Sequence, residues 1–186
     1  MLRLNLGCGK AHYEGFVNID KEESVKPDLL LDFITQPLPY KDNSVGDVYF
    51  IHTIEHIEEK YHFSILSEIW RVLMPDGQLM VAYPEFSRCA MNYINNYRGR
   101  KEFWKHTIYG RQLYPSDFHV SLMDTKEFVN LLEAVGFNRI SYDSEPGGES
   151  HNTVVLCYKN AQRPINREDL IRNEILESSK ISSIEV

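Results

Sequence analysis

Four short apolar segments stand before residue 53, and each is followed at once by a glycine or a polar residue. They are residues 2–6 before Gly7, 16–19 before Asp20, 29–31 before Asp32 and 45–51 before His52. Each has the length of a β-strand, and short apolar strands that end in polar or glycine residues and alternate with helices are typical of a parallel α/β sheet. In open α/β sheets, ligands bind at the carboxyl ends of the strands. We therefore expect the residues that follow these strands to meet at one edge of a sheet.

Two amphipathic helices come later in the chain. A helical repeat of apolar residues predicts a helix over about residues 61–74, which Pro75-Asp76-Gly77 should stop. The second predicted helix covers residues 124–135 and begins with Asp124 and Glu127 in the spacing of a capping box. Strands that alternate with helices in this way indicate an α/β fold with a parallel sheet.

Three further strands complete the predicted sheet. They cover residues 78–83, 139–142 and 153–158. The last two flank the turn Pro146-Gly147-Gly148, which predicts an antiparallel hairpin at one edge. We predict a doubly wound α/β fold with a mostly parallel sheet, in one domain over residues 1–160. Residues 161–186 are expected to form a polar helix or a frayed tail, and the sequence supports the two equally.

The composition is that of an ordinary globular domain from a reducing compartment. Three widely spaced cysteines form no CxxC pair, so neither a disulfide framework nor a zinc-finger site is expected. The first residues lack the pattern of a signal peptide, and no apolar run is long enough to span a membrane. We therefore expect a cytoplasmic protein with no membrane partner. The formal net charge of -7 argues against unspecific nucleic-acid binding by the whole surface.

The residues after the strands suit the parts of a nucleoside. Gly7 and Gly9 let the backbone pass close to a ligand. Asp20, at the end of the second strand, can accept hydrogen bonds from both hydroxyls of a ribose. Asp32, after the third, can accept one from an exocyclic amino group such as that of adenine. NAD fits less well, because its acid usually lies about 20 residues beyond the glycines. The alternative is that the glycines form a plain turn and the acids cap helices.

Several motifs resemble, in order, those of class I S-adenosylmethionine (SAM)-dependent methyltransferases. They are Leu4-Asn5-Leu6-Gly7-Cys8-Gly9-Lys10, Val17-Asn18-Ile19-Asp20, Asp32-Phe33 with Pro37-Leu38-Pro39-Tyr40, Asp42-Asn43-Ser44-Val45-Gly46-Asp47, Glu55-His56-Ile57 and Glu68-Ile69-Trp70-Arg71-Val72-Leu73-Met74-Pro75-Asp76-Gly77. The resemblance covers residues 2–84 and continues more weakly to residue 137. It implies SAM as the cofactor and a seven-stranded sheet whose seventh strand is antiparallel.

The resemblance also implies which residues contact SAM. The two glycines of the first motif would line the methionine part, and Asp20 would hold the ribose. Asp32 with Phe33 would frame the adenine, and the end of the fourth strand would face the sulfonium. Cys8 is expected to pack against the cofactor as a small residue and not to act as a nucleophile. The predicted contacts are Asn5, Gly7, Cys8, Gly9, Asp20, Asp32, Phe33, Ile51 and His52.

Two departures from the family pattern concern the first crossover. Lys10-Ala11 stands where the family has its third glycine. Residues 10–16 are also fewer than the dozen or so that usually join two parallel strands. We therefore predict a shortened first helix.

His52, His56 and His119 are the candidate catalytic bases, because histidine titrates near neutral pH and some methyl acceptors must lose a proton. Each could instead be a structural histidine. If a helix began near His52, then His52, Glu55 and His56 could form a metal site with His119. Some methyltransferases carry Glu-x-x-Glu-His at this point, and His52 in place of the first glutamate leaves few oxygen ligands for Mg²⁺. We therefore predict no metal, and expect Glu55-His56 to brace the site.

Residues 86–122 are predicted to be a substrate lid. Between residues 85 and 122 the chain is rich in aromatics and has six basic residues against three acidic ones. Such a segment can bind an anionic, ring-containing acceptor, or pack as a helical lid with solvated charges, which we favour slightly. We predict an O- or N-methyltransferase for a small-molecule or glycan-like polar acceptor. The alternatives are an RNA methyltransferase and a SAM-binding module without transfer activity.

Overall fold

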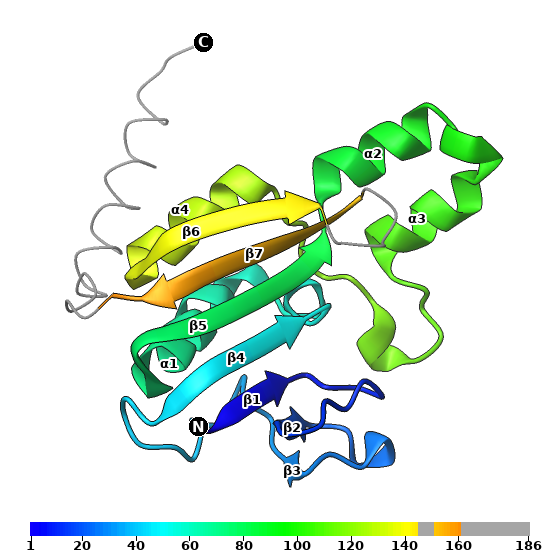
Figure 1. The fold of residues 1–186 in the computed structure, drawn as a ribbon. Helices are drawn as coiled ribbons and strands as arrows, with labels where there is room; N and C mark the ends of the chain where they lie inside the picture. The colour runs from blue at the N-terminus through cyan, green and yellow to red at the C-terminus, as the bar shows by residue number, and fades with distance from the viewer. Residues whose placement is uncertain (145–150, 161–186) are drawn as a thin grey trace, which may run out of the picture.

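The apolar segments near the N-terminus form neighbouring strands in the computed structural model, which describes residues 1–144 and 151–160. Within these residues a seven-stranded sheet has the order β3-β2-β1-β4-β5-β7-β6 (Figure 1). The strands are β1 Arg3–Leu6, β2 Val17–Asp20, β3 Leu29–Leu30, β4 Val45–Ile51, β5 Leu73–Pro84, β6 Phe137–Ser144 and β7 Asn152–Lys159. The α-helices are α1 His62–Val72, α2 Phe86–Ile94, α3 Lys101–Tyr109 and α4 Thr125–Val135. Short 3-10 helices are η1 Glu23–Val25, η2 Ile54–His56, η3 Glu59–Tyr61, η4 Tyr97–Gly99 and η5 Pro115–Asp117.

The strand directions confirm the predicted fold class. β1 to β5 run parallel, and β7 runs antiparallel to both of its neighbours, β5 and β6. β6 and β7 form the expected hairpin. β7 lies between β5 and β6, so that β6 is the strand at the edge of the sheet. The predicted turn at Pro146–Gly148 and the predicted C-terminal helix lie outside the described residues.

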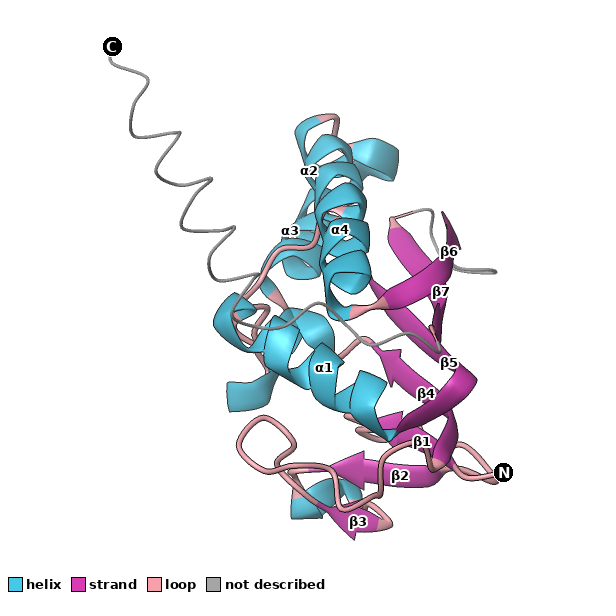
Figure 2. Ribbon diagram, turned by 90° about the vertical axis from the view of Figure 1, so that its left-hand side faces the viewer, coloured by secondary structure: helices cyan, strands magenta, loops and turns pink. Residues whose placement is uncertain are grey.

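The hydrophobic core lies between the sheet and helices α1 and α4, which cover the same face of the sheet (Figure 2). Leu66 and Ile69 of α1 and Leu132 of α4 are fully buried. Their burial is the physical reason for the apolar repeat that predicted both helices. None of the helices within residues 1–144 and 151–160 is long and apolar enough to cross a membrane.

Helix α4 begins and ends where its sequence signals predicted. The Asp124 carboxylate accepts the backbone N–H of Lys126 at 2.9 Å, and so satisfies a donor of the first turn. At the other end, Gly136 adopts a left-handed φ of 113° and closes the helix.

The connection from β1 to β2, residues 7–16, consists of turns and contains no helix. Asn5 donates its side-chain amide to the carbonyl of Ala11 at 2.8 Å and to Asn18 Oδ1 at 3.0 Å. The same Asn18 oxygen accepts the backbone N–H of Tyr13 at 2.9 Å. Side-chain hydrogen bonds thus hold a crossover that is too short for a helix. The predicted shortened first helix is reduced to turns.

β5 begins earlier than the sequence indicated. Helix α1 ends at Val72, and the strand starts at Leu73 and includes Pro75-Asp76-Gly77, which was expected only to stop the helix. The pairing of β4 with β5 shifts register between Val45 and Asp47. The residues expected to form a turn are therefore part of the strand, at an irregularity of the β-bulge type. Pairing with β4 outweighs the local preference of these residues for a turn.

Residues 86–122, predicted as a lid, form a helical insertion in which α2 and α3 pair and project beyond the carboxyl end of β5 (Figure 1). Trp104 is fully buried inside it, and its ring nitrogen donates to the carbonyl of Tyr97 at 3.0 Å. The chain returns to the carboxyl end of β5, where Met123 forms an isolated β-bridge with Glu85. The insertion therefore has a small aromatic core, which also packs against His151 just before β7.

His62, the first residue of α1, makes the stability of this fold sensitive to acid. Its side chain is buried, its Nε2 lies 2.9 Å from the carbonyl oxygen of Ile57, and burial lowers its pKa below the usual 6.5. Below pH 6.5 the unfolded chain binds more protons at this site than the folded chain does. The free energy of unfolding should therefore fall as the pH drops through that value.

We expect the urea midpoint to decrease between about pH 7.5 and about pH 5.5, and to decrease less in His62→Gln. Glutamine keeps an N–H donor for the Ile57 carbonyl but does not titrate. An identical pH slope in the two proteins would show that His62 is not a source of the acid sensitivity.

Candidate active site

The ends of β1 and β2 adjoin, as the strand pattern predicted. The backbone N–H groups of Gly7 and Cys8 both donate to the carbonyl of Ile19, at 2.8 and 3.0 Å. The N–H of Gly9 donates to Asp20 Oδ2 at 2.8 Å. The glycine turn is thereby fixed against the acid at the end of the second strand.

Gly7 and Gly9 both have left-handed backbones, with φ of 66° and 50°, but for different reasons. A Cβ on Gly7 would overlap the side chain of Thr53, so protein packing requires this glycine. A Cβ on Gly9 would meet no heavy atom within 4 Å. Gly9 therefore borders open space in which a ligand can lie against bare backbone.

Thr53 joins the ends of β1 and β4 and is a site residue that sequence reasoning missed. Its hydroxyl lies 3.2, 3.3 and 3.0 Å from the carbonyl oxygens of Leu6, Gly7 and Ile51. Leu6 is 47 residues away along the chain. Only the parallel pairing of the two strands reveals this contact, since no local pattern marks the threonine.

Asp20 and Asp32 lie at the ends of the neighbouring strands β2 and β3. Asp20 is nearly buried, and its two oxygens each accept one backbone N–H, from Gly9 at 2.8 Å and from Glu22 at 2.9 Å. A carboxylate oxygen has a second lone pair, which suits a ribose hydroxyl. Asp32 is half-buried and accepts the N–H of Ile34 at 3.1 Å. Both acids are therefore held rigidly by backbone donors.

Three other residues predicted to contact SAM are held in place by the surrounding protein. Phe33 packs edge-on against Phe50, with ring centroids 6.0 Å apart. Asn5 is buried and uses its amide N–H groups to brace the loop, so we assign it a positioning role. Burial raises the pKa of the Cys8 thiol to about 11. That thiol is protonated at neutral pH, which agrees with the expectation that it is not a nucleophile.

β4 ends at Ile51, and His52 then adopts a left-handed φ of 50°. Such a backbone is uncommon for a residue with a side chain and persists only where surrounding structure holds it. The N–H of His52 donates to the carbonyl of Ala82 at 2.8 Å, and its Nδ1 lies 3.4 Å from Glu55 Oε1. A buried carboxylate therefore orients a partly exposed imidazole at the end of β4.

Glu55, His56 and His119 come together beside His52, and we refer to these three as the histidine–glutamate cluster. Glu55 is 3% exposed, and its Oε2 has no hydrogen-bond partner among the described residues. The rings of His56 and His119 meet edge to face, with centroids 4.8 Å apart. All three predicted catalytic histidines therefore lie in one neighbourhood.

The segment that carries His119 is fixed on η2. The N–H groups of Val120 and Ser121 donate to the Glu55 carbonyl at 2.9 and 3.2 Å. The Ser121 hydroxyl donates to the carbonyl of Ile54 at 3.2 Å. Burial also lowers the pKa of His119, so its imidazole is neutral at physiological pH.

The basic side chains of the helical insertion have partners close by. Arg88 lies 3.8 Å from Glu85, Lys105 lies 3.2 Å from Glu102, and Arg111 lies 3.8 Å from Asp117. The others lie over aromatic rings, Arg98 over Tyr97, Arg100 over Phe103 and Lys101 over Tyr93. These pairings favour the interpretation of the insertion as a packed helical lid.

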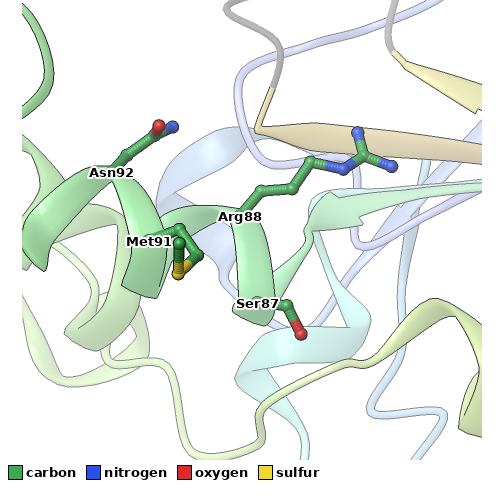
Figure 3. A pocket seen from close by; sticks show the side chains of 4 residues that line it. All are labelled: Ser87, Arg88, Met91 and Asn92. Carbon is green, nitrogen blue, oxygen red and sulfur yellow. The ribbon is translucent and has the colours of Figure 1, made fainter. Parts of the chain in front are cut away.

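A shallow hollow of about 260 Å³ lies on α2, lined by Ser87, Arg88, Met91 and Asn92 (Figure 3). The guanidinium of Arg88 reaches toward β7 and donates to the carbonyl of Asn152 at 3.3 Å. The hollow is smaller than the roughly 300–1,000 Å³ typical of ligand pockets. The strand ends carry more groups that suit a nucleoside than this hollow does.

Comparisons with known proteins indicate the type of domain to which these strand ends belong. The family described as "Methyltransferase domain" matches residues 8–81. The ubiquinone/menaquinone biosynthesis C-methyltransferase UbiE of Brucella canis is 26% identical over an alignment of 149 residues, and the match covers 71% of this chain and 52% of that protein. The chain thus spans about half the length of the curated relatives it matches.

Solved structures share the fold at low sequence identity. A SAM-dependent methyltransferase from Archaeoglobus fulgidus has a TM-score of 0.62 at 14% identity, covering 84% of this chain and 85% of that one. Human N-acetylserotonin methyltransferase in complex with SAM has a TM-score of 0.60 at 14% identity, covering 86% and 48%. Residues 8–81 match a methyltransferase domain, the fold is that of class I, Rossmann-like SAM-dependent methyltransferases, and SAM is the cofactor that these likenesses support.

Proposed function

We propose that this chain transfers the methyl group of SAM to a carbon atom of a small molecule that carries an acidic hydroxyl, such as a phenol or an enol. The observation that carries this proposal is the presence of His52 and the histidine–glutamate cluster beside the strand ends that suit SAM. Asp20 would hold the ribose, and the bare backbone at Gly9 would lie against the methionine part.

Bound SAM supplies a methyl group already activated by its sulfonium. An amine acceptor has a lone pair ready for this displacement, whereas a phenol or enol becomes nucleophilic only after it loses a proton. His52, oriented by Glu55 Oε1 at 3.4 Å, would take the hydroxyl proton. The adjacent carbon then bonds to the methyl carbon, and the electron pair of the C–S bond stays on sulfur. Loss of the proton from that carbon restores the phenol or enol.

The relatives support carbon as the acceptor atom. The curated relatives reported above are named C-methyltransferases, and this name favours carbon over the oxygen or nitrogen acceptor expected from the sequence. The local pairing of the insertion's basic residues weighs against RNA as the acceptor. A binding module without activity would have no need for His52 in a strained backbone at this strand end.

Labelling can test the acceptor class directly. The protein would be incubated with methyl-¹³C SAM and, separately, with the small-molecule fraction and the RNA of the source cell. We expect label in the small-molecule fraction, at a chemical shift of a carbon-bound methyl group. Label on oxygen or nitrogen, label in RNA, or SAM binding with no label in any fraction would each overturn the proposal.

Replacing His52 by asparagine should separate catalysis from cofactor binding. Asparagine tolerates the left-handed backbone of this position but cannot take a proton. We expect turnover to fall by at least about 100-fold, the size typical of a lost general base, with the SAM Kd changed less than about threefold. His106→Ala, an exposed histidine on α3, is the control. Equal turnover in the wild type and His52→Asn would show that His52 is not the catalytic base.

A further inference from the structure

We propose that the histidine–glutamate cluster, Glu55, His56 and His119, binds one divalent transition-metal ion of the zinc type. The inference rests on the proposed function only for the role of the ion, since the site itself is argued from its own contacts. One potential ligand atom from each residue lies within 4.8 Å of the other two. That spacing lets a single ion contact all three after small side-chain movements.

The two histidines are arranged as metal ligands usually are. His56 Nδ1 lies 2.9 Å from the carbonyl of Phe118, and His119 Nδ1 lies 3.1 Å from the carbonyl of Thr107. A carbonyl can only accept, so each Nδ1 carries the proton and each Nε2 keeps a lone pair. Metal-bound histidines typically donate their other ring N–H to a backbone carbonyl in this way, which fixes the tautomer and the ring direction.

The glutamate supplies the second, independent observation. Its side chain is 3% exposed, and its Oε2 has no partner among the residues that the structure describes. A buried carboxylate oxygen without a hydrogen bond is costly, and a cation removes that cost. Its other oxygen faces His52 Nδ1 at 3.4 Å, so Glu55 can contact the ion and the proposed base together.

The donor set indicates the class of ion. Two imidazole nitrogens and one carboxylate oxygen suit Zn²⁺, Co²⁺ or Fe²⁺, whereas Mg²⁺ prefers oxygen ligands. Sequence reasoning predicted no metal because it considered Mg²⁺, for which His52 in place of a glutamate leaves few oxygen ligands. Three protein ligands leave coordination positions open. An ion here could bind the hydroxyl oxygen of the acceptor and lower its pKa beside His52.

Zinc binding can be measured without SAM or acceptor. The protein would be stripped with a chelator, exchanged into clean buffer and titrated with Zn²⁺ against a chromophoric chelator. We expect one Zn²⁺ per chain, at least tenfold weaker binding in His119→Ala and Glu55→Gln, and unchanged binding in His106→Ala. Zn²⁺ should also raise the Tm of the wild type and of His106→Ala, but not of the two cluster variants. Co²⁺ in the same site should give visible absorption bands that are lost in His119→Ala.

Circular dichroism of the metal-free variants shows whether they fold. Loss of zinc binding in a folded variant can then be distinguished from loss of binding caused by unfolding. If either cluster variant fails to fold, His56→Gln replaces it, since the His56 side chain is half-buried whereas Glu55 is buried. The proposal is overturned if the wild type binds no more Zn²⁺ than the folded cluster variants, if His106→Ala loses binding equally, or if Mg²⁺ competes as well as Zn²⁺. None of these outcomes depends on methyl transfer, so the zinc site is tested independently of the proposed function.

Discussion

Asp20→Ala should weaken SAM binding at least tenfold, which is the largest effect on the cofactor that we expect from a single side chain. A hydrogen bond to a charged group contributes roughly 1.5–3 kcal/mol, which corresponds to about 10- to 150-fold in affinity. The carboxylate is nearly buried and rigid, because Gly9 and Glu22 donate to its two oxygens at 2.8 and 2.9 Å. Little entropy is therefore lost when ribose hydroxyls bind it.

Isothermal titration calorimetry with SAM measures this effect, with circular dichroism as the test of folding. Asp20→Asn keeps one acceptor for the Gly9 N–H but loses the charge, so its affinity should lie between those of the wild type and Asp20→Ala. Asp76→Ala is the control, because this exposed acid lies at the opposite end of the sheet. If a folded Asp20→Ala protein bound SAM with the affinity of the wild type, Asp20 would not be the residue that holds the ribose.

Gly7→Ala should destabilise the protein far more than Gly9→Ala, although both glycines have left-handed backbones. An alanine at either position costs about 1–2 kcal/mol for its backbone alone. At Gly7 the new methyl group would also overlap Thr53, and such overpacking typically costs a further ~1–3 kcal/mol. For a domain of this size we expect Gly7→Ala to lower the Tm by roughly 2–12 °C more than Gly9→Ala does.

The same pair of variants tests where SAM lies. A methyl group on Gly9 points into open space, where it would meet the methionine part of the cofactor. Gly9→Ala should therefore lose SAM affinity out of proportion to its small loss of stability, whereas Gly7→Ala should lose stability first. Unchanged SAM affinity in Gly9→Ala would mean that the open space beside Gly9 is not occupied by the cofactor.

Much of the geometry of the candidate cofactor site could be predicted from sequence, because its signals are local. Gly7 and Gly9 lie just after β1, Asp20 ends β2 and Asp32 lies just after β3. Parallel pairing alone brings the carboxyl ends of these strands together. The two residues that cap α4, Asp124 and Gly136, could likewise be identified from the sequence. The start of β5 was not, since pairing with β4 carried the strand through residues that locally favour a turn.

The acceptor half depends on contacts between distant parts of the chain. His56 bonds to Phe118 across 62 residues, and Thr53 reaches Leu6 across 47. No periodicity or motif records such pairings, because they arise only when the segment after α3 folds back onto η2. Sequence reasoning named His52, His56 and His119 separately but could not show that they share one neighbourhood.

By itself the amino-acid sequence determined the strands, the helices α1 and α4, and the four strand ends at which a nucleoside is expected, because each of these follows from residues that are neighbours in the chain. The tertiary structure alone decided that Gly7 is needed to make room for Thr53, and that Glu55 meets His56 and His119 with one buried oxygen unpartnered. The physical reason is that burial and the directions of side chains are properties of the packed molecule, set by which distant segments exclude water together.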